Sequence, residues 1–346
     1  MEEYRMTRSR SAHTGEVKVA AILPCYKSRA HAAGVIAGIG PEVDRIYAID
    51  DCCPEGTGKH IQETVSDPRV MVHFHEVNMG VGGAVKTGYD LALKDGCGIM
   101  VKIDSDGQMD PRLIPQLIRP ILMEAADYVK GNRFYNPEDV RDMPRTRLYG
   151  NMGLSFLTKL SSGYWNIFDP TNGFTAIHAT ALRALPMDKI SNRFFFETDM
   201  LFRLNLAAAV VRDMPMRAVY GDEVSNLNVR KALFEFGIKH VGIFLKRIVY
   251  QYFLRDFGFG SFCLLFGLPL LLFGTLFGAY GFLRSLSTGV LATPGTVMLA
   301  ALPVIVGLQF LFGFFAQDQN AVPRVPLQIL RDVWSPAERT PDMETK

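Results

Sequence analysis

The chain has 346 residues and a formal net charge of +2, with 37 basic against 35 acidic side chains. That length is enough for one large core or two domains, and the near-neutral balance does not indicate a nucleic-acid-binding protein. The charges are unevenly spread, because residues 257–316 carry a single charged side chain, Arg284. The composition therefore predicts a bipartite chain, an ordinary α/β region followed by a membrane-like segment.

The N-terminal residues 1–16 are polar and basic and lack the apolar stretch of a signal peptide, so we expect a disordered tail. The cysteines show neither the paired spacing of a metal site nor the framework of a secreted domain, which predicts free thiols in a reducing cytosol. They are Cys25, Cys52, Cys53, Cys97 and Cys263.

The first part of the chain alternates between two kinds of segment. Apolar, β-branched runs at residues 17–26, 43–53, 70–77 and 97–106 predict strands, and the segments 30–39, 57–65 and 83–96 between them predict helices. Strands alternating with helices of this length indicate a mostly parallel sheet covered on both faces. In such sheets the chemistry lies at the carboxyl ends of the strands.

The pattern continues more loosely as far as residue 220. Helices are expected at 113–125, 147–163 and 194–209, strands at 126–134 and 210–220, and a strand followed by a helix within 172–185. We therefore expect one catalytic domain over residues 17–228.

The C-terminal third has the features of a membrane attachment. Residues 229–256 include a basic amphipathic helix, which predicts a position in the membrane interface, with a core-packing helix as the alternative. Two uncharged stretches, 258–283 and 295–316, are each long enough to cross about 30 Å of hydrocarbon and predict a transmembrane hairpin over 257–316, rather than two buried helices of a soluble core. Basic residues flank the hairpin on its outer sides. This bias places the catalytic domain, both termini and the tail 317–346 in the cytoplasm, on a multi-pass protein of the cytoplasmic membrane.

Carboxylates follow the strand expected at 97–106. Asp104 and Asp106 are separated by one residue, and Gln108 adds an amide oxygen close by. Oxygen ligands of this kind suit Mg²⁺ or Mn²⁺, which commonly bridge one or two carboxylates and a substrate phosphate. Such a cation offsets the repulsion between the carboxylates and neutralises a diphosphate leaving group. The pattern predicts a divalent-cation site, although a solvated turn is the alternative.

A glycine-rich turn, "NMGVGGAVKTGYDLA", opens the helix expected at 83–96. It is not a dinucleotide-binding fingerprint, because valine stands at position 85, where that pattern requires a third glycine. The turn allows a ligand to approach the backbone with Lys86 nearby, or it serves tight strand–helix packing. Both interpretations remain open at this point.

Taken in order, "LPCY", "AIDDCCPEGT", the glycine-rich turn, "DSDGQMDP", "KGNRF", "DPTNGF" and the C-terminal hairpin resemble family 2 glycosyltransferases with the Rossmann-like GT-A fold. The chain is similar to the polyprenyl-phosphate sugar transferases among them, such as dolichyl-phosphate mannose synthases and bacterial undecaprenyl-phosphate glucosyltransferases. The match in order and spacing covers about residues 18–225.

This resemblance implies a role for each matching position. The nucleotide-sugar donor would be bound by Pro24, Tyr26, Asp51, Lys86, Asp104, Ser105 and Asp106; the cation by Asp106, Gln108 and Asp104; the acceptor phosphate by Arg133, Arg147 and Asn151. Asp169 and Asp104 would be the catalytic residues. Two departures touch the nucleotide pocket, since Lys27-Ser28 and Cys52-Cys53 replace the family's usual Asn-Glu and Gly-Ser.

The implied activity is a metal-dependent, inverting transfer of a sugar from a nucleoside diphosphate to a polyprenyl phosphate at the bilayer. Alternatives are transfer to a lipid-diphosphate-linked sugar or to another acceptor, and a membrane scaffold with a decayed site. A processive polysaccharide synthase is disfavoured, because its Gln-x-x-Arg-Trp motif is missing. Gly274 and Gly278 would allow close helix contact, either in a homo-oligomer or within the hairpin itself.

Overall fold

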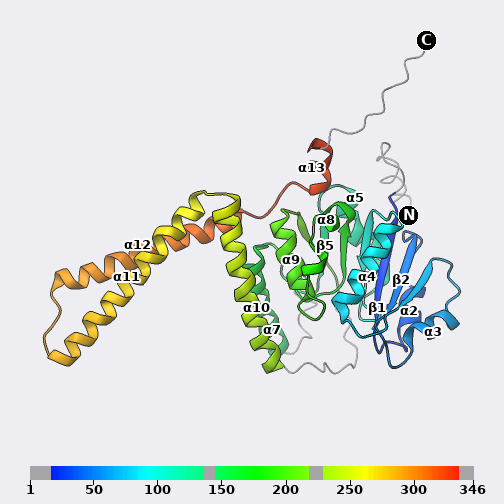
Figure 1. Ribbon diagram of the computed structural model, residues 1–346, viewed down its shortest axis with the longest axis horizontal. Helices are drawn as coiled ribbons and strands as arrows, with labels where there is room; N and C mark the ends of the chain where they lie inside the picture. The colour runs from blue at the N-terminus through cyan, green and yellow to red at the C-terminus, as the bar shows by residue number, and fades with distance from the viewer. Residues whose placement is uncertain (1–16, 136–144, 218–228, 335–346) are drawn as a thin grey trace, which may run out of the picture. The chain divides into compact units, whose positions relative to one another are not determined.

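The computed structural model describes residues 17–135, 145–217 and 229–334, without the side chains of 145–147, 229–235 and 331–334. The tail expected at residues 1–16 lies outside these residues. The chain divides into two compact units, which are drawn in Figure 1. The catalytic unit contains the residues up to Ile243 and those from Pro323 onward, and the hairpin unit contains Phe244–Val322.

A seven-stranded sheet forms the centre of the catalytic unit. Its strands are β1 (Val19–Cys25), β2 (Arg45–Asp50), β3 (Val70–Phe74), β4 (Ile99–Lys102), β5 (Tyr128–Asn132), β6 (Thr175–His178) and β7 (Val211–Pro215), in the order β3-β2-β1-β4-β6-β5-β7. All neighbouring pairs are parallel except the two that include β6, which runs antiparallel to β4 and β5. The predicted mostly parallel α/β sheet is confirmed.

Helices connect the strands, each close to its predicted position. They are α2 (Ala32–Ala37), α3 (Thr57–Thr64), α4 (Val81–Lys94), α5 (Ile114–Leu122), α7 (Arg145–Ser162), α8 (Ala179–Arg183) and α9 (Phe196–Leu206). Short 3₁₀ turns at Pro111–Leu113 and Met187–Lys189 complete the connections.

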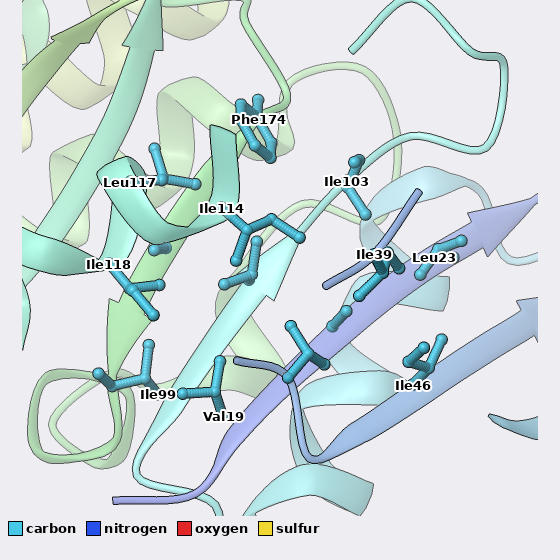
Figure 2. Close-up of a cluster of buried hydrophobic side chains, with 14 of the residues drawn as sticks. Val19, Leu23, Ile39, Ile46, Ile99, Ile103, Ile114, Leu117, Ile118 and Phe174 are labelled. Atoms are coloured by element: carbon cyan, nitrogen blue, oxygen red, sulfur yellow. The ribbon is translucent and has the colours of Figure 1, made fainter. Parts of the chain in front are cut away.

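One face of the sheet carries an entirely apolar core. Successive residues of a strand point to opposite faces, so every second residue of β1 and β4 enters this core. Figure 2 shows Ile114, Leu117 and Ile118 of α5 beside the β4 segment that carries Ile99 and Ile103, with Val19 of β1 next to Ile99 and Leu23 of β1 next to Ile39. All of these side chains are buried. We call this side of the sheet the apolar face.

The opposite side of the same strands, which we call the polar face, buries charged groups. The strand register aligns Lys102 of β4 with Thr175 of β6, Thr175 with Lys130 of β5, and Lys130 with Asp213 of β7. Both lysines are fully buried. Helices α4 and α9 supply partners on this side, among them Tyr89 and Glu197. Buried charges need compensating partners, so this face requires a specific arrangement that the apolar face does not.

The hairpin unit contains two long apolar helices. They are α11 (Phe259–Thr288) and α12 (Pro294–Asn320), and both are long and apolar enough to cross a membrane. Most of their large apolar side chains are exposed, which a helix in the core of a soluble protein would not allow.

The two hairpin helices pack closely through glycines. A Cβ on Gly274 would lie 2.7 Å from the carbonyl oxygen of Ala300, and one on Gly307 would lie 2.8 Å from the backbone nitrogen of Leu271. Gly274 is one of the two glycines for which the sequence left a contact in a homo-oligomer open. Packing within the chain therefore accounts for Gly274.

The helix expected in the membrane interface is α10 (Val229–Val249), followed by a π-helical turn at Tyr250–Arg255. Within the catalytic unit, Phe236, His240 and Ile243 of α10 pack against Phe195 and Phe202. This part of the helix thus has the core-packing role that stood as the alternative. On other sides α10 exposes Ile238, Val241 and Leu245, so a position in the interface stays a prediction.

The segment predicted as a plain cytoplasmic tail contains a helix of the catalytic unit, α13 (Leu327–Trp334). The backbone N–H groups of Leu327 and Gln328 donate to the buried carboxylate of Asp127, and the Gln328 side chain donates to the carbonyls of Ile121 and Ala126. The chain therefore returns from the hairpin to dock at the start of β5.

Candidate functional site

The candidate site lies at the carboxyl edge of β1, β2 and β4, which are neighbouring parallel strands. Pro24 lies near the end of β1, and Asp51 and Asp104 lie in the segments after β2 and β4, so the fold brings them to one edge as expected. The Ser105 hydroxyl donates to the carbonyl of Pro24 (2.7 Å) and lies 2.7 Å from the hydroxyl of Ser28. Ser105 thus joins the loops after β1 and β4, and its role in donor binding stays a prediction.

Asp51 is held by the glycine-rich turn that opens α4. Its carboxylate accepts from the backbone N–H groups of Met79 (2.8 Å) and Gly80 (2.7 Å), and the imidazole Nδ1 of His75 lies 2.8 Å from it. The left-handed backbone at Gly80 (φ 85°) is a conformation that favours glycine. A Cβ on Gly82 would collide with the carbonyl of Ser191. Both glycines therefore serve local geometry and close packing, the second of the two sequence interpretations.

Asp104 lies directly beyond β4 and is paired with a buried lysine. The Lys102 ammonium is 2.9 Å from Oδ1 of Asp104 and 3.2 Å from Oε1 of Glu197, which is in the first turn of α9. Burial lowers the pKa of Lys102, but the two carboxylates outweigh that effect and raise the pKa overall. Asp104 thus faces an internal cation on one side.

Asp106 and Gln108 occupy the turn after Asp104. The backbone N–H of Gln108 donates to Oδ1 of Asp106 (3.0 Å), and Gly107 between them adopts φ 80°. Within the described parts of the chain, no group of three or more His, Cys, Asp and Glu side chains forms a metal cluster. Asp104, Asp106 and Gln108 are all half-buried and offer only oxygen donors from their side chains. This set fits a hard cation that takes its other ligands from phosphate and water.

Asp169 and Arg133 are brought together from two different loops. Nε and Nη2 of Arg133 donate to the two carboxylate oxygens of Asp169 at 2.7 and 2.9 Å, and the Arg133 backbone N–H donates at 3.2 Å. The Asp169 side chain is 1% exposed and that of Arg133 is 19% exposed. A bidentate pair of this kind fixes both groups, so Asp169 is a well-oriented anion here.

The remaining predicted residues lie in varied surroundings. Tyr26 is exposed at the edge, and Asn151 is half-buried on α7. The Lys86 ammonium donates to the carbonyl of Ile190 (2.9 Å), and burial lowers its pKa. That contact does not support the predicted role of Lys86 in donor binding. Arg147 belongs to α7, but its side chain lies outside the described residues.

Three charged residues close to this site were missed from the sequence. Lys102 and Lys130 interrupt apolar strand runs, a signal that was available, whereas the position of Glu197 depends on how α9 packs. The Lys130 ammonium donates to the backbone carbonyl of Asn172, three residues after Asp169. Burial lowers the pKa of Lys130 to about 8.

Helix α7 buries polar side chains and exposes apolar ones, the reverse of the usual pattern for a surface helix. It buries Ser155, Thr158, Ser161 and Ser162, and it exposes Tyr149, Met152, Phe156 and Leu157. The hydroxyl of Ser155 donates to the carbonyl of Phe168, next to Asp169. An exposed apolar stripe on a helix marks a surface that meets another apolar surface. The stripe is thus carried by the same helix that contacts the segment of Asp169 from its buried side.

Known proteins resemble this chain in sequence and in fold. A family model described as glycosyl transferase family 2 matches residues 20–185. A UDP-N-acetylglucosamine–dolichyl-phosphate N-acetylglucosaminyltransferase of Methanococcus voltae is 30% identical over 213 residues, which cover 58% of this chain and 84% of that protein. An undecaprenyl-phosphate mannosyltransferase of Micrococcus luteus is 29% identical over 208 residues, which cover 59% and 84%.

Among solved structures, glucosyl-3-phosphoglycerate synthase from Mycobacterium tuberculosis with Mg²⁺ and uridine diphosphate is similar, with a TM-score of 0.50 and 18% identity. The likeness covers 70% of this chain and 83% of that one, and it supports the fold alone. Together with the sheet order and the sequence relatives, these matches lead to one assignment. The chain belongs to glycosyltransferase family 2, and its catalytic unit has the GT-A fold.

Proposed function

We propose that this glycosyltransferase transfers a sugar, with inversion, from a nucleoside-diphosphate sugar to a polyprenyl phosphate at the surface of a membrane. The proposal is carried by one observation. Asp104 and Asp106 lie just after β4, at the carboxyl edge of the sheet, in the same unit as the bidentate Arg133–Asp169 pair. The names of the two relatives supply the acceptor class, dolichyl phosphate in one and undecaprenyl phosphate in the other.

The hairpin and the exposed stripe of α7 support a site at the bilayer. The phosphate of a polyprenyl lipid emerges at the bilayer surface, while its chain stays in the hydrocarbon. A catalytic unit that exposes Tyr149, Met152 and Phe156 on α7, the helix whose Ser155 donates to the Phe168 carbonyl before Asp169, suits such an acceptor. Two helices able to cross the membrane would hold the unit there. We propose that the catalytic domain and both termini face the cytoplasm.

In the proposed reaction, an oxygen of the acceptor phosphate attacks the anomeric carbon of the donor sugar, and the bond to the diphosphate breaks. The second pKa of a phosphate monoester is about 6, so the nucleophile is already ionised at neutral pH and needs no general base. Asp169 then acts by orienting Arg133 and by stabilising positive charge at the sugar. Arg133 and Arg147 would position the acceptor phosphate through charge-assisted hydrogen bonds.

A divalent cation would be held by Asp106, Gln108 and Asp104, with Mg²⁺ or Mn²⁺ as the fitting ions. When bound, it supplies positive charge that stabilises the departing diphosphate. Pro24, Tyr26 and Asp51 would border the nucleoside. Asp51 is already fixed by two backbone N–H groups, so its orientation would not have to change when the donor binds.

The test is a turnover assay on the full chain in detergent, with a panel of UDP- and GDP-sugars and polyprenyl phosphate, with and without Mn²⁺ or Mg²⁺. We expect sugar on the monophosphate lipid only when metal is present. Sugar transferred solely to a lipid-diphosphate-linked sugar, or to another small acceptor, would contradict the proposed acceptor. Nucleotide binding without any transfer would contradict the enzymatic role.

Two variants separate the donor side from the acceptor side. Asp106→Ala should abolish turnover, and Asp110→Ala is its control, because Asp110 pairs with the exposed Arg112 in the same loop. Arg147→Ala should chiefly raise the KM for the lipid, with Arg45→Ala at the exposed start of β2 as its control. Wild-type activity of the Asp106 variant would exclude the metal assignment.

A further inference from the structure

One oxygen of the Asp104 carboxylate is restrained by a row of paired charges, Glu197–Lys102–Asp104, which we call the ion-pair chain. Lys102 connects Oδ1 of Asp104 (2.9 Å) to Oε1 of Glu197 (3.2 Å). The lysine side chain is 1% exposed, that of Glu197 13%, and that of Asp104 29%. Lys102, in the middle, is thus the most buried of the three and Asp104 the most exposed, so Asp104 is the member that reaches the edge where the donor is proposed to bind.

The other oxygen of the Asp104 carboxylate lies against the backbone of Gly173. A Cβ on Gly173, in the "DPTNGF" segment, would collide with Nζ of Lys102 and Oδ2 of Asp104. The Gly173 backbone is thus in close contact with both groups, at a position where any side chain would displace them. One oxygen of Asp104 faces an ammonium group, and the other faces this glycine.

Glu197 is well anchored for holding the lysine. It lies in the first turn of α9, between the buried Phe196 and the seven buried residues that follow it in the helix. The Lys102 side chain begins on the central strand β4, which is hydrogen-bonded on both sides. Both ends of the chain are therefore rigid, and a buried ammonium between two carboxylates leaves little freedom for Asp104 to rotate.

We propose that Lys102 and Glu197 are positioning residues that hold Asp104 in the orientation in which it serves the nucleotide-sugar donor and its cation. This inference rests on the proposed function, which places Asp104 against the donor. Neither residue touches the donor itself: Glu197 acts through Lys102, and Lys102 acts through Asp104. On the acceptor side, Asp169 is held instead by the bidentate contact with Arg133.

The primary variant is Glu197→Gln, which keeps the shape and one acceptor oxygen but removes the charge. We expect the KM for the donor and the dissociation constant for Mn²⁺ to rise about ten-fold, the scale found when outer partners of a ligand residue are changed. The KM for polyprenyl phosphate should stay within about two-fold, since this side of the site is unaltered. Lys102→Met is a poorer choice, because it leaves two acids facing each other and endangers folding.

Gly173→Ala tests the same carboxylate without changing any charge. Its Cβ should displace Asp104 and reproduce the donor and Mn²⁺ defects of Glu197→Gln. Gly34→Ala is the matched control, because a Cβ at Gly34 meets nothing within 4 Å. For the charge change, the control is Arg203→Met, which removes an ion pair with Asp199 on the same helix α9.

Binding of Mn²⁺ in the presence of UDP, and separately of GDP, is followed by electron paramagnetic resonance on the full chain in detergent. Selective donor and Mn²⁺ defects in Glu197→Gln, together with donor and Mn²⁺ defects in Gly173→Ala and neither in the controls, would support the positioning role. Unchanged donor KM and Mn²⁺ affinity in Glu197→Gln would overturn it. So would equal losses in donor, lipid and thermal-stability measurements, which indicate general unfolding.

The two proposals fail in different ways. If the wild-type enzyme transfers no sugar to polyprenyl phosphate, the proposed function is wrong, yet the Mn²⁺ titrations of wild type and Glu197→Gln still decide whether Glu197 supports the cation site. If the wild type transfers sugar but binds no Mn²⁺ with either nucleotide, the positioning role in its stated form is wrong.

Discussion

The apolar face and the polar face of the central sheet are built from the same strands, yet the polar face also buries charged side chains. On β4, Val101 enters the apolar core while its neighbour Lys102 enters the charged layer, and on β5 the same holds for Val129 and Lys130. The apolar face can be filled by any well-packed hydrocarbon, whereas each buried charge on the polar face needs a specific partner. The comparison suggests that one face supplies stability while the other orders the site.

The polar face also holds groups that are destabilised by their burial. Burial lowers the pKa of Lys130 to about 8 and raises that of Asp213 to about 6, so both groups are shifted towards their neutral forms. Proteins tolerate such groups when they serve a site. Three experiments test whether the two faces differ in this way.

The largest effect on stability should come from the apolar face. Leu117→Ala removes a fully buried side chain of α5 and should lower the free energy of unfolding by about 3 kcal/mol, the usual cost of such a cavity. The kcat and both KM values of the folded enzyme should be unchanged. Chemical unfolding in detergent measures the first quantity and the turnover assay the second. Met123→Ala, at an exposed residue after α5, is the control.

Lys130→Met on the polar face should have a smaller effect on stability than Leu117→Ala, and it should lower activity instead. The variant removes the donor to the Asn172 carbonyl and should loosen the segment that carries Asp169, lowering kcat about ten-fold. Stability should change by only about 1 kcal/mol, because a desolvated charge is removed together with its contact. Val129→Ala, one residue earlier on the other face, should show the reverse. Equal changes in kcat and in stability for the two variants would contradict the proposed difference between the faces.

The smallest effect is a pH dependence from Asp213, whose folded pKa is raised above its unfolded value by burial. A group of this kind stabilises the fold below its unfolded pKa, near 3.9, and that contribution is lost as pH rises through about 6. Asp213→Asn removes the titration, so its stability relative to wild type should increase by about 1–2 kcal/mol between pH 4 and pH 7. Unfolding at several pH values measures this difference, and a constant difference would contradict the assignment.

Local pattern was sufficient to predict the elements of the catalytic unit. Apolar runs ending in Pro24, Asp51 and Asp104 predicted strands whose carboxyl ends meet, and the structure places β1, β2 and β4 side by side. The two apolar helices could be predicted for a similar reason, since uncharged apolar stretches of that length are typical of membrane-spanning helices. The pairing of Arg133 with Asp169 was not visible, because these residues lie 36 positions apart and meet only through the packing of two loops.

The sequence by itself determined the family, the strands and helices, the acidic residues at the site edge and the two apolar helices, because motifs, periodicity and length are local properties. Only the tertiary structure decided the antiparallel insertion of β6, the return of α13 to Asp127 and the burial of Lys102 between Asp104 and Glu197. Each of these depends on contacts between segments far apart in the chain. Such contacts form when whole elements bury their surfaces together, and no single window of sequence records them.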